Sequence, residues 1–285
     1  MAKYIGTYAT SGDVQTALDN RELSRPFIAY TTDNEDVIFG SAADKAEVGD
    51  IVVYSVADDL LHYIKQADYS ASTYPVADYV PVGVVAYPQN DDPILGPSGE
   101  ITFMGVNWLD KNKPDTGNTN AQAIEWGYNN FDIPELTNYA NSGTAITDMN
   151  GKANTQIVLN YATAQTDWRT ASAITFANEA GYYPLFECAW RYHTSGTAQG
   201  DWYVPAAGQI SYIIFNNIVL EKMSTSLNIL DKPLYWEPNS SYLSSNENNK
   251  GNIWYASYPN AYLRSFGKES ARRCRPFCSK LMTRI

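Results

Sequence analysis

Histidine and cysteine are scarce in this chain, and their scarcity excludes several kinds of site. The 285 residues contain two histidines and three cysteines. Two histidines leave acid–base catalysis few groups to use, and a metal site at His193 would find only His62 as a second nitrogen ligand. An odd number of cysteines builds no disulfide framework and fits a reducing compartment. No glycine-rich phosphate loop or Ser/His/Asp set stands out either. We therefore expect no catalytic residues, no metal and no cofactor.

Basic residues are also few relative to acidic ones. The chain has 20 Lys and Arg against 31 Asp and Glu, a net charge of −11. Affinity for nucleic acid depends on basic contacts to phosphate, so we expect no nucleic-acid partner. The cations that are present gather in residues 250–285, which hold eight Lys or Arg against Glu269 alone, so the remaining chain carries −18. These cations are either solvated or paired with acids of the same domain, or they bind an anionic ligand such as an acidic glycan.

Long apolar segments are absent as well. No run of 18 apolar residues occurs, and the start MAKYIGTYATSGDVQ lacks the apolar core of a secretory signal. We expect synthesis in the bacterial cytoplasm and a soluble protein, unless it leaves inside a larger particle. Aromatic residues, by contrast, are abundant: 22 Tyr and 7 Trp in a chain that is 44% hydrophobic and 18% charged. This composition indicates a folded protein with amphipathic aromatic side chains to spare for binding.

Residues 1–40 form a small segment that looks separate from the rest. Ser11 or Asp13 can cap a short helix over SGDVQTALDNREL, and PFIAYTT and DVIFG are strand-like on either side of a turn. A segment of this size buries little apolar area by itself. We expect it to pack against a partner chain or the main domain, as an attachment or oligomerisation segment.

Residues 41–285 combine short strands with helices, which indicates an α+β fold. A polar stretch runs over about 110–150, and its PDTGNTNAQ portion predicts a surface loop rather than a linker between domains. Helices are predicted twice within 151–180, in TQIVLNYATAQ and DWRTASAITFANEAG, and once over 206–223, where apolar residues recur with a period near 3.6. The segment SSYLSSNENNKGN at 240–252 approaches low complexity. Strands are predicted in the β-branched and aromatic runs VGDIVVYSV, LLHYIK, YVPVGVVAYP, EITFMGVNWL, PLYWEP, NIWYASY, AYLRSF and RRCRPFC.

Several longer strings carry a resemblance to a known family. They are DMNGKANTQ (148–156), TAQTDWRTASAITFANEAGYYP (163–184), CAWRYHTSGTAQGDWYVPAAGQISYI (188–213), YWEP (235–238) and RCRPF (273–277). In these strings the chain resembles the C-type-lectin-like variable proteins of diversity-generating retroelements, known from gut bacteria and their phages. The DWYVP element followed by a helix is the commonest marker of that group. The resemblance covers roughly 45–285, and residues 1–40 look like the head of a phage structural protein.

The resemblance implies a C-type-lectin-like fold with two helices and short antiparallel strands, preceded by a small N-terminal attachment segment. In this family, reverse transcription rewrites adenines in the last stretch of the gene, and Asn codons are favoured starting points. The rewritten side chains lie on a solvent-facing surface over a constant scaffold. A variable region of about 236–272 fits this pattern, because it holds six asparagines among Ser and Tyr: Asn239, Asn246, Asn248, Asn249, Asn252 and Asn260.

The same resemblance divides the C-terminal residues into scaffold and binding face. The scaffold would comprise Trp202, Pro205, Trp236, Trp254, Arg275 and Pro276. The exposed ligand-binding residues would be Glu237, Asn239, Ser241, Tyr242, Ser257, Tyr258, Asn260, Tyr262, Arg264, Phe266 and Glu269. This composition is also what an antibody paratope uses on physical grounds. Two positions depart from the family: Gln209-Ile210 stands where it has Glu-Leu beside a helix cap, and Glu237-Pro238 where it has serines.

Three alternatives remain open. Glu237-Pro238-Asn239 spells the sugar-binding element of calcium-dependent lectins, although its place at the start of the variable region makes coincidence the better interpretation. Formylglycine-generating enzymes share this broad fold, and Cys274 and Cys278 could serve as the cysteine pair of such an oxidoreductase if neighbouring arginines lower the thiol pKa. A purely structural virion protein would use the Asn-rich segment to contact a neighbouring subunit.

Our leading hypothesis is a non-catalytic receptor-binding or adhesion protein at the tip of a phage tail or fibre, with the bacterial cell surface as the alternative location. Its ligand would be a host cell-surface protein or glycan. Residues 1–40 would bind virion or tail subunits. Weak affinity at one site would be multiplied by several copies, so we expect a homo-oligomer, with a trimer favoured.

Overall fold

A computed structural model describes residues 3–8, 27–31, 37–39, 46–88, 100–165, 181–232, 240–258 and 260–285. The predicted helices at 11–23 and 167–181 and the predicted strand PLYWEP lie wholly or almost wholly outside these residues. Within them the chain is α+β, as the sequence indicates. No helix in these ranges is both long and apolar enough to cross a membrane.

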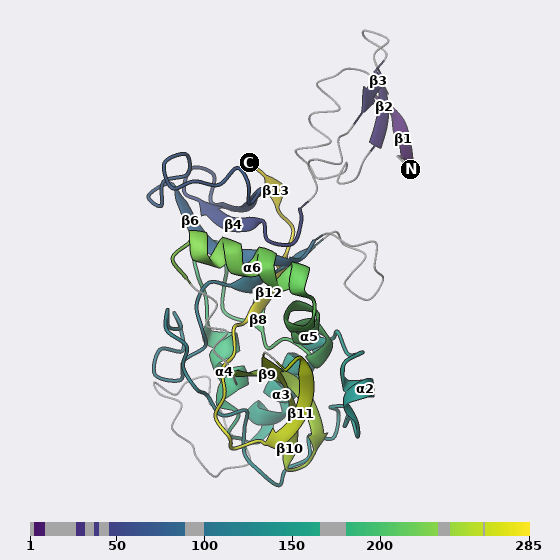
Figure 1. Cartoon of the computed structure of the whole chain (residues 1–285), viewed down its shortest axis with the longest axis vertical. Helices are drawn as coiled ribbons and strands as arrows, with labels where there is room; N and C mark the ends of the chain where they lie inside the picture. The colour runs from purple at the N-terminus through teal and green to yellow at the C-terminus, as the bar shows by residue number, and fades with distance from the viewer. Residues whose placement is uncertain are drawn as a thin grey trace.

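A seven-stranded sheet forms the centre of the main part of the chain (Figure 1). Its strand order is β13-β5-β4-β6-β7-β12-β8, and every neighbouring pair is antiparallel except β13 with β5. The predicted strands between 48 and 109 are confirmed, and RRCRPFC contributes its end to β12. The strands are β4 (Ile51–Ser55), β5 (Leu60–Ile64), β6 (Tyr79–Tyr87), β7 (Ile101–Gly105), β8 (Trp202–Tyr203), β12 (Phe277–Lys280) and β13 (Thr283–Arg284).

Both faces of this sheet are buried. Val85 and Phe103 pack on one face in a cluster that includes Phe186 of helix α4 (Pro184–Arg191). On the opposite face, side chains of β6 and β7 pack against helix α6 (Asn217–Ile229). At Gly83 the strands approach so closely that a Cβ would lie 2.7 Å from the Met104 carbonyl oxygen and would overlap the Phe103 ring. Glycine is therefore required in the middle of β6.

The predicted helix over 206–223 is two helices rather than one. Helix α5 (Ala207–Phe215) ends at Asn216, and α6 (Asn217–Ile229) begins there. The Asn216 side chain accepts hydrogen bonds from the Ile218 and Val219 amides at 3.1 and 3.4 Å. Asparagine is a strong N-cap residue, so it starts a new helix although the apolar period continues through it. Helix α3 (Gly151–Gln165) confirms the first of the two helices predicted within 151–180.

A second sheet has the order β11-β10-β9 and is antiparallel throughout. Its strands are β9 (Ser240–Asn249), β10 (Asn252–Tyr258) and β11 (Tyr262–Gly267). Strands β10 and β11 confirm NIWYASY and AYLRSF, whereas β9 comes from the segment that approaches low complexity. In Figure 1 this sheet lies at the bottom of the view, with α5 beside it.

The polar stretch over 110–150 is mostly irregular and includes the short helix α2 (Ser142–Ala145). The predicted surface loop PDTGNTNAQ (114–122) has no helix or strand, and its residues are mostly exposed or half-buried. The polar stretch also gives four side chains to the main core: Ile124, Trp126, Ile133 and Leu136. Its apolar side chains are too widely spaced to give a periodic signal, yet each reaches the core from an irregular backbone.

The N-terminal segment contributes a third, small sheet. Strand β2 (Phe27–Thr31) pairs in parallel with β1 (Lys3–Tyr8) and antiparallel with β3 (Val37–Phe39). The strands expected in PFIAYTT and DVIFG are confirmed, and β1 was not predicted. In Figure 1 this sheet lies at the top of the view, apart from the seven-stranded sheet.

Candidate functional site

The register of β10 and β11 decides which predicted binding residues face solvent. Tyr255 pairs with Arg264 and Ile253 with Phe266. Because side chains alternate along a strand, Tyr262, Arg264 and Phe266 share one face of β11. Leu263, between them, points to the other face and packs with Trp254 and α5 residues.

The expectation of an exposed side chain is wrong for two of the predicted binding residues, Tyr242 and Ser257. Tyr242 is 2% exposed and Ser257 is 6% exposed, so neither side chain can form part of a binding face in this structure. Tyr242 packs among α5 residues and stacks on Trp108 at 6.0 Å between ring centroids. The cause is that both faces of β9 and β10 are covered, one by α5 and the other by the main core.

The exposed side chains are therefore concentrated on β11 and the turns at its two ends. Ser241, Tyr258 and Tyr262 are half-buried. The exposed candidates are Asn260, Arg264, Phe266 and Glu269, with Phe266 at 39%. Glu237 and Asn239 lie outside the described residues. We call the following set the β11 surface: Asn260, Tyr262, Arg264, Phe266 and Glu269.

Two arginine–aromatic contacts organise the β11 surface. The Arg264 guanidinium lies 4.2 Å from the centroid of the Tyr262 ring, and the Arg272 guanidinium lies 4.4 Å from that of Phe266. The edge of Phe266 also meets Tyr255. Cation–π contacts of this kind hold long side chains in defined positions. Sequence reasoning missed Arg272 as part of this surface. The residue follows β11, so the alternation of side chains along the strand does not extend to it.

A buried ion pair lies beneath this surface. Lys268, which follows β11, contacts Glu247 of β9, and both side chains are fully buried. The Lys268 ammonium also donates to the Phe131 carbonyl at 2.5 Å and lies 5.0 Å from the Trp126 ring centroid. Burial raises the pKa of Glu247 to about 7 and lowers the pKa of Lys268. The pair ties the end of β11 to β9, on the far side of β10.

A buried polar network fixes the middle of β9. Asn246 is fully buried; its amide nitrogen donates to Asp148 at 2.5 Å and its amide oxygen accepts from the Ala207 amide at 2.7 Å. Asn154 of α3 donates to the same Asp148 carboxylate at 2.8 Å. One of the six asparagines of the expected variable region is thus a structural residue that holds the start of α5.

The predicted scaffold residues that the structure describes are buried. Trp202 is 1% exposed, Trp254 6% and Arg275 4%, and Pro205 and Pro276 are buried too. Trp236 lies outside the described residues. Gln209 accepts a hydrogen bond from the Ala206 amide at 2.9 Å, so the helix-cap contact is made with Gln in the place of Glu.

The C-terminal cations are largely used within the domain. Lys268 pairs with Glu247, Lys280 with Asp201 at 2.6 Å, and Arg284 with Asp68 at 3.0 Å. Arg275 donates to the carbonyls of Gly105 and Val106. Of the two interpretations of this charge, contacts within the domain therefore account for at least half of the eight cations, and an acidic ligand would meet Lys250 and Arg264, whose side chains are exposed.

The two C-terminal cysteines lie in unreactive settings, and both histidines contact neighbouring polar groups. Cys274 and Cys278 are both buried, and burial raises the pKa of each thiol, whereas a reactive thiol needs a lowered pKa. His62 contacts Thr283 and Asp58, and His193 contacts the Arg191 carbonyl. Among the described residues no group of three metal-ligating side chains occurs.

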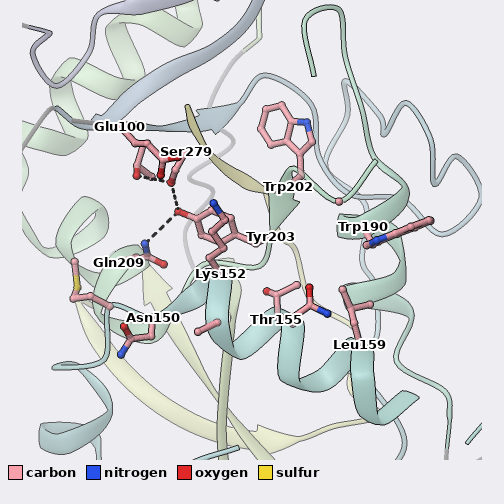
Figure 2. Close-up of a pocket in the computed structure, with 15 residues that line it drawn as sticks. Glu100, Asn150, Lys152, Thr155, Leu159, Trp190, Trp202, Tyr203, Gln209 and Ser279 are labelled. Carbon is pink, nitrogen blue, oxygen red and sulfur yellow. Dashed lines mark hydrogen bonds between the residues drawn. The ribbon is translucent and has the colours of Figure 1, made fainter. Parts of the chain in front are cut away.

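A cavity of about 430 Å³ lies beside α3, away from the predicted face (Figure 2). In the close-up, Glu100, Ser279, Tyr203 and Gln209 line one side of it, and Trp190 lies at the other end, beyond Thr155. Sequence reasoning did not predict this cavity, because its lining comes from segments far apart in the chain. The lining residues are Glu100, Thr102, Met149, Asn150, Lys152, Ala153, Thr155, Gln156, Leu159, Trp190, Gly200, Trp202, Tyr203, Gln209 and Ser279.

Comparison with known proteins finds similarity in fold alone. No protein-family model matches the chain, and no curated protein matches its sequence. A fimbrial protein from Bacteroides ovatus has a similar structure, with a TM-score of 0.52 and 16% identity over 81% of this chain and 48% of that one. The chain thus spans about half the length of that protein. At this identity, what the two share is an architecture, and this chain has the α+β fold of which the fimbrial protein is another example.

Proposed function

We propose that the chain is a non-catalytic adhesion protein that binds a target on a cell surface through the β11 surface. The observation that carries this proposal is the row of the half-buried Tyr262 and the exposed Arg264 and Phe266, which two arginine–aromatic contacts hold in place. Tyr and Arg are enriched among the residues that dominate binding energy at interfaces. Exposed aromatic and arginine side chains that are already ordered lose little entropy on binding.

The rigid base under this row supports the same proposal. Substitutions at Asn260, Tyr262, Arg264, Phe266 or Glu269 would change the surface without removing a core side chain, because these residues are exposed or half-buried. The Lys268–Glu247 pair and the Asn246 network hold the strands below in one arrangement. Such a division between exchangeable surface and constant base suits a protein whose target varies.

The fold comparison is compatible with this proposal. The similar structure is that of a fimbrial protein, a component of a surface appendage. We infer from it an adhesive or structural role for this chain, and nothing more specific.

We further propose the finer assignment that the sequence resemblance implies: a C-type-lectin-like variable protein diversified by a retroelement. It would lie at the tip of a phage tail or fibre, with the bacterial cell surface as the alternative. Residues 1–40 would bind the particle, and a homo-oligomer, a trimer above all, would multiply a weak affinity. The oxidoreductase alternative finds no support in the buried thiols of Cys274 and Cys278.

Binding to intact cells tests the adhesion proposal. The fluorescently labelled protein would be incubated with a panel of gut Bacteroides isolates and bound protein measured by flow cytometry. The triple variant Tyr262→Ala, Arg264→Ala, Phe266→Ala should lose binding to any isolate that the wild type labels, with an unchanged melting temperature.

A matched control carries Tyr212→Ala and Ile218→Ala, which remove exposed apolar side chains elsewhere on the surface. This control should bind as the wild type does. If the triple variant binds as well as the wild type, the β11 surface is not the binding site. If the wild type labels no isolate but the triple variant changes its oligomeric state, the surface is a subunit contact and the structural role replaces adhesion.

A further inference from the structure

We propose that the cavity beside α3 is a second binding site, which takes a neutral sugar residue. None of the residues that line it belongs to the β11 surface. This inference therefore goes beyond the proposed function and can fail or hold without it. Its volume of about 430 Å³ lies within the 300–1,000 Å³ range of small-molecule sites.

The aromatic part of the lining provides an apolar surface at Trp190. Trp190 lies near the end of α4 and is half-buried. The turn at Gly200 lies against it: the Gly200 amide donates to the Trp190 carbonyl at 2.8 Å, and a Cβ at 200 would lie 3.3 Å from the indole nitrogen. Trp202 and Tyr203 also border the cavity, but they follow each other on β8, so their side chains point to opposite faces of the sheet. The C–H face of a pyranose ring gains dispersion contacts and loses water against the indole of Trp190.

The polar part of the lining is a cluster of hydroxyl and amide groups. Ser279 Oγ lies 2.8 Å from Thr102 Oγ1 and 3.1 Å from the Tyr203 hydroxyl, and Gln209 donates to that hydroxyl at 3.5 Å (Figure 2). Each hydroxyl supplies one proton and can accept two hydrogen bonds, so the cluster keeps unused acceptor positions even when every proton is shared within it. These positions match the O–H donors of a sugar.

The rigidity of this cluster makes the cavity a preformed site. Thr102 and Tyr203 are each 3% exposed and Gln209 is 2% exposed, so their positions are set by packing before any ligand enters. Gln209 is also held by its bond to the Ala206 amide at the start of α5. A ligand therefore meets groups that need not be reordered on binding.

The charges in the lining select against ionic ligands. The lining contains one acid, Glu100, and one base, Lys152. A phosphate or carboxylate would meet Glu100, and a cation would meet Lys152, so neither sign finds a site of uniform charge. A fatty acid would place its apolar chain against the hydroxyl cluster, and burying those hydroxyls without new hydrogen bonds costs free energy. A neutral molecule with an apolar ring face and many hydroxyls satisfies both halves of the lining.

Saturation-transfer NMR on the full chain tests this inference, with methyl glucoside, methyl galactoside and N-acetylglucosamine as probes at millimolar concentration. Sodium phosphate and octanoate are the charged and apolar comparison ligands. At least one sugar should receive saturation from the protein and should bind about tenfold more weakly or worse to Trp190→Ala, the loss typical when a contact aromatic is removed. Ala153→Leu, at an exposed helix position in the lining, should block the cavity without uncovering any core residue.

Two controls separate this site from the β11 surface. Tyr212→Ala removes an exposed aromatic outside the lining and should leave sugar binding unchanged. Arg264→Ala should also leave it unchanged, even where it abolishes binding to cells. The inference is overturned if no sugar shows saturation transfer, if the signal survives both Trp190→Ala and Ala153→Leu, or if phosphate or octanoate binds in preference to the sugars.

Discussion

The substitution Lys268→Met is the perturbation whose effect on folding stability follows most directly from the structure. The methionine side chain replaces the apolar stem of the lysine, but the ammonium that meets the Glu247 carboxylate and the Phe131 carbonyl is lost. Glu247 then remains fully buried without its cation. Removing one partner of a buried ion pair typically costs about 3–5 kcal/mol. At ~2–4 °C per kcal/mol for a large domain, the melting temperature should fall by roughly 10 °C.

The pH dependence of that loss follows from the carboxyl group. Burial already raises the pKa of Glu247 to about 7 with Lys268 present, and Lys268 lowers that pKa, so its removal raises it further. A carboxyl whose pKa is higher in the folded state contributes stability at low pH that is lost as the pH rises through the folded pKa. The deficit of Lys268→Met relative to wild type should therefore be larger at pH 8 than at pH 6.

Urea denaturation followed by tryptophan fluorescence at both pH values measures this effect. The matched control is the double variant Lys268→Met, Glu247→Leu, which replaces both charges by apolar groups and should recover most of the lost stability. A single variant within about 0.5 kcal/mol of wild type, the scale of an ordinary surface substitution, would refute the reasoning. So would a double variant no more stable than the single one.

Three further predictions concern other parts of the molecule. Asn246→Ala should lower the free energy of unfolding by about 1–3 kcal/mol, because it leaves the Ala207 amide unpaired; calorimetry that finds no change would exclude a structural role for the asparagine. Cys274 and Cys278 should resist a thiol reagent at pH 8 in the folded protein and react on unfolding, since burial raises their pKa; labelling of the native protein would contradict this. In related isolates, codons for exposed positions of 260–269 should differ, and only where a neighbouring template copy has adenine, whereas the Asn246 codon should stay constant. Differences spread evenly over all bases would contradict the retroelement assignment.

The strands were predictable where the signal is local. Runs such as IVVYS and NIWYASY combine β-branched and aromatic residues between turn residues, and they form β4 and β10. Strand β9 carries no such signal, because its Ser, Asn and Glu side chains favour loops. It is a strand because Asn246 and Glu247 find buried partners more than 20 residues away in Asp148 and Lys268.

The binding face was predictable in composition but not in orientation. The sequence places Tyr242, Tyr258 and Tyr262 in equally polar surroundings, and only the register of the sheet shows that Tyr242 points into the core. A shift of one residue in register would exchange the two faces, and sequence alone does not determine it. The cavity is less predictable still, since Glu100, Trp190 and Ser279 meet only through the fold.

The most direct test of the account is photo-crosslinking from the β11 surface. The photoreactive amino acid p-benzoylphenylalanine would replace Phe266, which is 39% exposed, and in a matched protein Tyr212, which is 38% exposed and lies on α5. Both proteins would be irradiated on an isolate that the wild type labels. We predict a covalent adduct with a cell-surface component from position 266 and none from position 212. Equal adducts from the two positions, or an adduct from 212 alone, would contradict the claim that this protein meets its target through β11.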